Sequence, residues 1–145
     1  MITKTRSVLL AGRRRYSLDL LKNALSEWGY HVIEAQTGGE LISALWRPSL
    51  VIADLTTLGV QAPSLLQAIN YFRPGIPVIL LHDYPTLNEA LAALKAGAED
   101  FLTQPVDYER LKLVVERSLV SQQALYDVED SSDEFREACS TFRFR

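Results

Sequence analysis

Four short strand-like runs in this sequence end in residues that could bind ions or polar groups, and Asp54 is the most informative of these residues. It follows the apolar run "LVIA" within "SLVIADLTT". A carboxylate at the end of such a segment must be solvated in a crevice or paired, because burying an unpaired charge is costly. The alternative is an aspartate that only caps a turn. Asp54 is therefore the first candidate for a functional site.

The other three runs are followed by basic or polar residues, which are Gly12, Arg13, Arg14 and Arg15 after the first run, His82 and Asp83 after "PVILL", and Gln104 and Pro105 after "EDFLT". If the runs are neighbouring parallel strands, their carboxyl ends meet at one edge of the sheet. We therefore predict a single crevice around Asp54, formed by Gly12, Arg13, Arg14, His82, Asp83, Gln104 and Pro105. No nucleophile–base–acid set, glycine-rich phosphate loop or zinc-binding spacing accompanies them, so we do not expect an enzyme.

Two periodicities alternate between residues 7 and 124. Strand-like runs cover 7–11, 31–35, 50–54, 77–82 and 99–103, and helical patterns follow them, with Ser17, Thr37, Pro63, Thr86 and Asp107 at their predicted starts. Parallel strands need crossover connections, which are almost always right-handed. The alternation predicts an α/β fold, a doubly wound parallel sheet of five strand–helix units.

The spacing of several motifs resembles the receiver domain of two-component response regulators over about residues 6–122. "LVIADL", "PVILL" and "ALKAGAEDFLTQP" carry the resemblance, and the last is the most specific of them. The resemblance implies a flavodoxin-like fold with strand order 2-1-3-4-5. It also implies that Asp54 is the candidate phosphoacceptor for a histidine kinase and that Phe101 is the switch aromatic.

The sequence departs from the family pattern around Asp54. A typical receiver carries two Mg²⁺-binding acids after the first strand, a Ser or Thr after the fourth, a Lys before Pro105, and a Met-Pro pair with a later Gly after the phosphoacceptor. The residues found instead are Gly12 and Arg13, His82, Gln104, and Thr57, Leu58 and Ala62. Of the pattern, Asp54, Phe101 and Pro105 remain.

These departures predict an atypical receiver with no metal site or other cofactor, because Mg²⁺ prefers carboxylate and water oxygens and a nearby arginine repels it. A guanidinium close to Asp54 could form an ion pair with it instead. We expect Arg13, or failing that Arg14, to pair with Asp54 and to fix the crevice in one state. The alternative is that all three arginines are solvated loop residues.

His82 has three interpretations. It is a hydrogen-bonded structural residue, a pH-sensitive partner of Asp54, or part of a transition-metal site with Asp83 and Asp54. One imidazole and two carboxylates are a thin ligand set, so the structural role is favoured.

The composition limits compartment and partners. The net charge is −3, and nothing makes one face basic enough to predict nucleic-acid binding. The sequence carries no secretory signal and no apolar run long enough to span a membrane. A single cysteine, Cys139, cannot form an internal disulfide, which favours a reducing, cytoplasmic setting.

We divide the chain into a receiver domain, residues 1–124, and an acidic linker or tail, residues 125–145, which could begin a longer chain. The expected function is signalling by protein–protein interaction, with impaired Mg²⁺-dependent phosphorylation. The expected partners are a histidine kinase or other signalling protein, or a second copy bound through the face formed by the fourth helix, the fifth strand and the closing helix. The alternatives are a phosphoacceptor receiver modified on Asp54 and a flavodoxin-like small-molecule binder.

Overall fold

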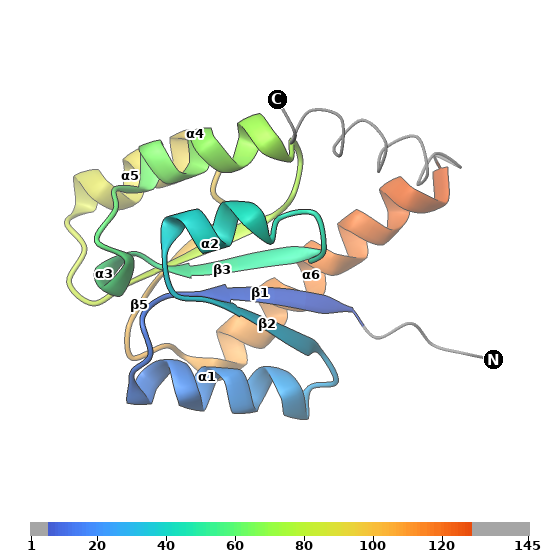
Figure 1. Cartoon of the computed structure of the whole chain (residues 1–145), viewed down its shortest axis with the longest axis horizontal. Helices are drawn as coiled ribbons and strands as arrows, with labels where there is room; N and C mark the ends of the chain where they lie inside the picture. Colours follow the sequence, from blue (N-terminus) through green and yellow to red (C-terminus); the bar gives the residue numbers. More distant parts are fainter. Residues whose placement is uncertain (1–5, 129–145) are drawn as a thin grey trace.

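A five-stranded parallel sheet with helices on both faces forms the molecule in a computed structural model (Figure 1). The structure describes residues 6–128, with side chains up to Val120. The strands are β1 (Ser7–Ala11), β2 (His31–Ala35), β3 (Leu50–Asp54), β4 (Val78–His82) and β5 (Asp100–Thr103). The helices are α1 (Tyr16–Glu27), α2 (Gly38–Ser43), α3 (Leu55–Leu58), α4 (Ala62–Phe72), α5 (Leu87–Lys95) and α6 (Tyr108–Val128).

The strand order is β2-β1-β3-β4-β5, and every neighbouring pair is parallel. This confirms the flavodoxin-like α/β fold and the order 2-1-3-4-5. β3 is central and buried along its whole length, including Asp54, as expected for a strand covered on both faces. The register pairs Asp54 with Leu81 on β4, and it pairs His82 with Thr103 on β5. The carboxyl ends of the strands therefore meet at one edge.

Two hydrophobic clusters lie on opposite faces of the sheet. One joins α2, α4 and α5 to the strands through residues such as Leu41, Ile69 and Ala93. The other joins α1 and α6 to the strands through residues such as Leu21 and Val115. Alternating residues of a strand point to opposite faces, so β3 contributes Val51 to the first cluster and Ile52 to the second.

Most of the predicted helix boundaries are supported by capping contacts. Thr86 and Glu89 form a reciprocal capping box at the start of α5, and the carboxylate of Asp107 accepts hydrogen bonds from the backbone N–H groups of Glu109 and Arg110. The Thr37 hydroxyl accepts from the Glu40 N–H at the start of α2. These contacts satisfy N–H groups that a helix start leaves without partners.

Two helix starts differ from the sequence prediction, and one short helix was not predicted. Ser17 is not the N-cap of α1, because the helix already begins at Tyr16 and Arg15 holds the N-cap position with an extended backbone. α4 begins at Ala62, one residue before Pro63. The short helix α3 after Asp54 was not predicted, and it positions two threonines of the candidate site.

α6 continues to Val128, past the predicted boundary at residue 124. Cys139, the closing segment 135–145 and the acidic residues from 129 onward lie outside the described residues.

Candidate functional site

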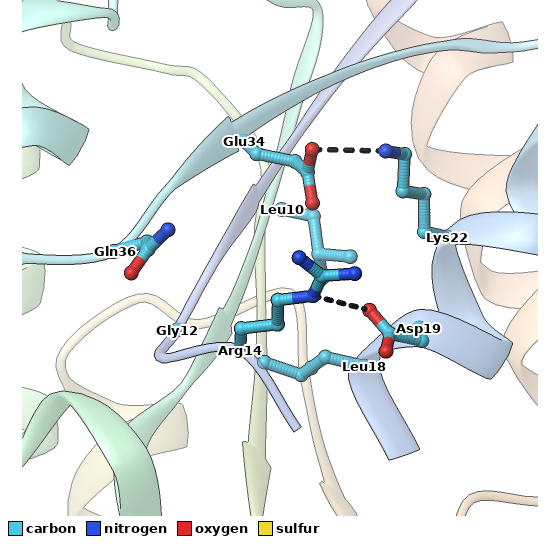
Figure 2. A pocket seen from close by; sticks show the side chains of 8 residues that line it. All are labelled: Leu10, Gly12, Arg14, Leu18, Asp19, Lys22, Glu34 and Gln36. Atoms are coloured by element: carbon cyan, nitrogen blue, oxygen red, sulfur yellow. Dashed lines mark hydrogen bonds and ion pairs between the residues drawn. The ribbon is translucent and has the colours of Figure 1, made fainter. Parts of the chain in front are cut away.

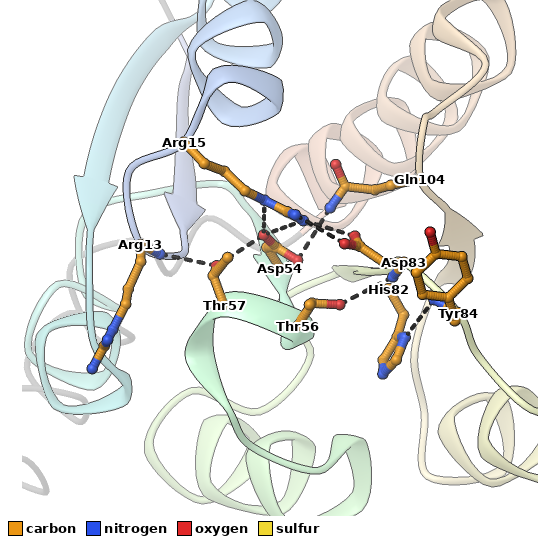
Figure 3. Close-up of polar contacts among 9 residues, drawn as sticks. All are labelled: Arg13, Arg15, Asp54, Thr56, Thr57, His82, Asp83, Tyr84 and Gln104. Carbon is orange, nitrogen blue, oxygen red and sulfur yellow. Dashed lines mark hydrogen bonds and ion pairs between the residues drawn. The ribbon is translucent and has the colours of Figure 1, made fainter.

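Asp54 is fully buried at the carboxyl end of β3, with none of its surface exposed. Three side chains donate to its carboxylate (Figure 3). Arg15 approaches Oδ2 with Nε at 3.1 Å and Nη2 at 2.8 Å, and the Thr57 hydroxyl donates to the same oxygen at 2.8 Å. Gln104 Nε2 donates to Oδ1 at 3.1 Å. The buried charge is thus paired and hydrogen-bonded through both oxygens, as burial of a carboxylate requires.

Arg15 also binds Asp83, the residue that follows β4. Its Nη1 donates to Oδ2 of Asp83 at 2.9 Å, and its Nη2 donates to Oδ1 at 2.8 Å. This is the two-bond geometry for which a planar guanidinium is suited. One cation therefore joins Asp54 and Asp83 across the crevice, and its side chain is 29% exposed.

The expected pairing of Asp54 with an arginine is present, but the residue is Arg15 and not Arg13 or Arg14. Only the backbone N–H of Arg13 reaches the site, where it donates to the Thr57 hydroxyl at 3.0 Å. In Figure 3 its side chain points away from Asp54. Arg14 lies 3.7 Å from Asp19 across a largely exposed pair. The difference arises because Arg15 is the N-cap of α1, and its extended backbone directs the side chain back over the crevice.

Gly12 lies so close to the site that no side chain fits there. A Cβ atom on Gly12 would lie 2.7 Å from Leu18 Cδ1, 2.9 Å from Thr57 Oγ1 and 3.0 Å from Asp54 Cβ. The Thr57 hydroxyl therefore occupies space that an acidic side chain at position 12 would need. Glycine at position 12, where the family pattern has an acid, therefore leaves room for the Thr57 side chain.

α3 fixes two neighbouring loops through its threonines. Thr57 contacts both Asp54 and the backbone of Arg13, and the Thr56 hydroxyl accepts a hydrogen bond from the backbone N–H of Asp83 at 3.0 Å. From the sequence, Thr57 was only a departure from the family pattern, and neither Thr56 nor Arg15 was predicted as a site residue. The position of Arg15 next to a helix start was the one signal for its role.

Gln104 and Pro105 complete the crevice from β5. The backbone N–H of Gln104 donates to the His82 carbonyl at 2.9 Å, and the Gln104–Pro105 peptide bond is cis. Gln104 has a neutral amide where the family pattern has a lysine, so it gives Asp54 a hydrogen bond but no positive charge.

His82 lies at the predicted edge but does not contact Asp54. Its Nδ1 accepts a hydrogen bond from the Tyr84 backbone N–H at 3.1 Å, and its Nε2 lies 3.6 Å from a Glu89 carboxylate oxygen. Its ring stacks on Phe101 with centroids 6.3 Å apart. These contacts agree with the structural interpretation of His82. Among the side chains of residues 6–120, no three of His, Cys, Asp or Glu gather in a metal-binding group.

The ion pairs also shift the acid–base properties of the site. The hydrogen bonds from Arg15 lower the pKa of Asp83 below its ordinary value, with charge attraction to Arg15 adding to the effect. The same contacts with Asp83, and then with Asp54, raise the pKa of Arg15. Both groups therefore remain charged at neutral pH, which strengthens the ion pair between Arg15 and Asp83.

A small cavity of about 170 Å³ lies next to Gly12, between α1 and β2 (Figure 2). Leu10 and Leu18 are its apolar lining residues, and two ion pairs are formed among its charged lining residues. They join Arg14 to Asp19 and Lys22 to Glu34. Pockets for drug-sized ligands usually measure about 300–1,000 Å³, so this cavity does not support the small-molecule-binder alternative.

Within residues 6–128, no helix is both long and apolar enough to cross a bilayer.

Comparison with known proteins identifies relatives of the same kind. The family model for the response regulator receiver domain matches residues 8–116. The chain is 31% identical over 102 residues to the transcriptional regulatory protein ZraR of Klebsiella oxytoca, covering 69% of this chain and 23% of that protein. It is 36% identical over 104 residues to the transcriptional regulatory protein GlrR of Escherichia coli K12, covering 70% of this chain and 23% of that protein. The chain thus spans about a quarter of the length of these relatives.

Solved structures agree with this result. The signal receiver domain of a putative LuxO repressor protein from Vibrio parahaemolyticus superposes with a TM-score of 0.78 at 27% identity, covering 87% of this chain and 98% of that one. NtrX from Brucella abortus superposes with a TM-score of 0.76 at 27% identity, covering 88% of this chain and 29% of that one. The match over most of residues 6–128, together with the strand order and the buried Asp54, shows that the chain belongs to the response regulator receiver domain family and that it is a signal-transduction module.

Proposed function

We propose that this receiver domain signals by binding another protein in a state that Arg15 holds fixed, without Mg²⁺-dependent phosphorylation of Asp54. The observation that carries the proposal is the guanidinium of Arg15, whose nitrogens lie within 3.1 Å of Asp54 and 2.9 Å of Asp83. It places a permanent positive charge where phosphorylation of a receiver needs a metal ion.

The residues at this edge do not fit a Mg²⁺ ion. Mg²⁺ needs oxygen ligands in near-octahedral geometry, usually one or two carboxylates with waters. Asp54 and Asp83 are the carboxylates of the crevice, and both already bind Arg15. An additional carboxylate at position 12 is excluded by the contacts of a Cβ with Thr57 and Asp54. A divalent cation would have to displace a paired guanidinium from a buried carboxylate.

β5 also lacks the positive charge that would stabilise a phosphoryl group on Asp54. Phosphoryl transfer depends on positioning and on neutralising the negative charge of the transferred group. Gln104 offers a neutral N–H donor, and it is already engaged with Asp54. His82, at the position of the family hydroxyl, faces Glu89 and Phe101 instead. The residues that remain around Asp54 hold it as an ion pair rather than as a reactive nucleophile.

A small phosphodonor tests this part of the proposal. The purified chain, its Arg15→Ala variant and a receiver that retains both metal-binding acids are incubated with acetyl phosphate and Mg²⁺, and each is weighed by intact mass spectrometry. We expect a phosphoryl adduct on the control receiver and none on this chain. An adduct at Asp54 in this chain, lost in Asp54→Asn, would support the phosphoacceptor alternative and contradict the proposal.

The proposed docking face consists of α5, β5 and α6. α5 exposes leucines one helical turn apart, with Leu87 74%, Leu91 48% and Leu94 46% exposed, and it buries only Ala93. Leu113 on α6 is 67% exposed. Leucines at such spacing form one stripe on a helix, and exposed apolar patches mark interaction sites. We propose that this face binds a signalling partner or a second copy of the chain.

The leucine stripe can be tested by substitution. A Leu91→Glu and Leu94→Glu double variant should lose partner binding or dimerisation, measured by light scattering coupled to size-exclusion chromatography and by pull-down with candidate histidine kinases. A matched Ser64→Glu and Gln67→Glu variant, on the exposed side of α4, should keep it. Equal behaviour of the two variants would show that α5 is not the docking face.

A further inference from the structure

An exposed aromatic surface lies at the opposite edge of the sheet from Asp54. Trp46, between α2 and β3, is 58% exposed, and Tyr71, near the end of α4, is 63% exposed. The guanidinium of Arg47 lies 5.7 Å from the centre of the Trp46 ring. We call Trp46, Arg47 and Tyr71 the Trp46 surface. Trp, Tyr and Arg are the residues most enriched among those that dominate binding energy in protein interfaces.

The two aromatic residues are held on one scaffold by Arg73, which is 6% exposed. Its guanidinium donates to the backbone carbonyls of Leu45 and Pro48, so the residue after α4 is tied to the segment that contains Trp46. Tyr71 also packs edge-on against Phe72, with ring centres 5.0 Å apart. A surface already held in place loses little conformational entropy when it binds a partner.

The charge on this surface favours an acidic partner. Arg47 is exposed, and among the side chains of residues 6–120 no carboxylate lies within ion-pair distance of its guanidinium. In the sequence, "EDSSDE" at 129–134 carries four acids and no base, and Phe135, Phe142 and Phe144 follow it. This segment thus combines acids for Arg47 with aromatic rings for Trp46 and Tyr71, and such ring pairs stabilise one another beyond their buried area.

The path of the chain places this segment within reach. α6 begins after β5 at the edge that holds Asp54, and its 21 residues extend about 31 Å. The strands have only four or five residues, so α6 runs past their starts. Figure 1 shows its end on the same side of the molecule as the end of α4 and the start of β3. Residues 129–145 can span up to about 55 Å, which is ample for contact with the Trp46 surface.

We propose that residues 129–145 of this chain bind the Trp46 surface, with the acids against Arg47 and the phenylalanines against Trp46 and Tyr71. This contact lies at the end of the domain opposite the ion pairs of Arg15 with Asp54 and Asp83. It uses no residue of the Asp54 site, so it stands or fails separately from the proposed function.

Fluorine NMR of the full chain labelled with 5-fluorotryptophan tests the proposal. The protein contains two tryptophans, and Trp46→Phe assigns their signals. Trp28 is an internal control, because it packs against Tyr108 on the other face of the sheet. A Phe135→Ser, Phe142→Ser and Phe144→Ser triple variant should shift the Trp46 signal and increase its H₂O/D₂O isotope shift, while the Trp28 signal stays in place. Arg47→Glu should act in the same direction, and Tyr84→Ser, which changes an exposed aromatic elsewhere, should not.

Two results would overturn the proposal. The first is a Trp46 signal that is the same in the full chain and in the triple variant, which would show that the phenylalanines do not cover it. The second is a Trp46 signal that changes with protein dilution, which would show that a second copy of the chain is the occupant.

Discussion

At the scale of single residues, the site depends on Arg15, and in the proposed function its guanidinium takes the place of the positive charge of a metal ion. The Arg15 side chain contacts Asp54 and Asp83, which follow different strands. Its contacts therefore hold the ends of β3 and β4 relative to α1. Because a guanidinium supplies this charge continuously, we propose that the site has no separate unliganded state.

Removal of Arg15 should destabilise the domain far more than removal of its neighbour Arg13. Arg15→Ala leaves the buried carboxylate of Asp54 with two neutral donors, Thr57 and Gln104. Breaking a buried ion pair costs about 3–5 kcal/mol, and we expect about 2–3 kcal/mol here because Arg15 keeps some solvent contact. Arg13→Ala, whose side chain is exposed, should change the free energy of unfolding by less than about 0.5 kcal/mol. Urea denaturation measures both, and similar losses would contradict the assigned pairing.

The contribution of Asp83 should depend on pH. Its folded-state pKa lies below the ordinary value of 3.8, so its pairing stabilises the fold above that pH and is lost as the pH falls through the folded-state pKa. At neutral pH, Asp83→Asn should be less stable than the wild-type chain by about 1 kcal/mol, since the pair is partly exposed. The difference between the two denaturation midpoints should stay constant from about pH 7 down to about pH 4, and it should shrink as the pH falls below 3.8 and through the folded-state pKa. Asp19→Asn, at a more exposed pair, is the control, and a gap that persists in acid would contradict the prediction.

The sequence predicted the place of the site better than its contacts. The apolar run before Asp54 indicated a buried strand end, and the positions of His82, Asp83 and Gln104 followed from the same rule. The choice among the arginines failed because it rested on spacing from β1, whereas the direction of each side chain depends on where α1 begins. With Ser17 taken as the N-cap, Arg15 was treated as a loop residue, and its extended backbone could not be foreseen.

At the scale of elements, the β1–α1 loop and α3 fit each other around Gly12. Thr57 fills the space beside Gly12, and its hydroxyl accepts from the Arg13 N–H while it donates to Asp54. α3 was missed because its four residues are too few to show a helical period. The strands and longer helices were predictable because their hydrophobic patterns extend over whole elements.

A side chain at position 12 should therefore disturb the whole edge. Gly12→Ala places Cβ within 3.0 Å of Leu18, Thr57 and Asp54, and overpacking of this kind costs about 1–3 kcal/mol. Gly12→Asp, which introduces the family residue, should cost more. Gly38→Ala, where a Cβ meets nothing within 4 Å, is the matched control and should be within about 0.5 kcal/mol of wild type. Thermal unfolding measures the series, and a neutral Gly12→Asp would show that the loop can open for a metal-binding acid.

At the scale of the whole molecule, the receiver fold is kept, and we propose that the chemistry at the carboxyl edge of its sheet is replaced. The family match, the strand order and the two hydrophobic clusters agree on the architecture. Fold and site chemistry separate in this way because the core depends on hydrophobic patterning, whereas the site depends on a few side chains at strand ends. The account therefore predicts a domain that has the surface of a receiver and lacks its metal-dependent switch.

The most direct test is an ¹H–¹⁵N NMR titration of the chain with Mg²⁺ and then with beryllofluoride, which mimics a phosphoryl group on an aspartate. We expect no change in the chemical shifts of the Asp54, Asp83, Gln104 and Phe101 amides. The reason is that Arg15 already occupies the carboxylates that the ion and the mimic need. Saturable shifts of these signals, abolished by Asp54→Asn, would contradict this expectation and would show that the crevice still takes up a metal ion and a phosphoryl group.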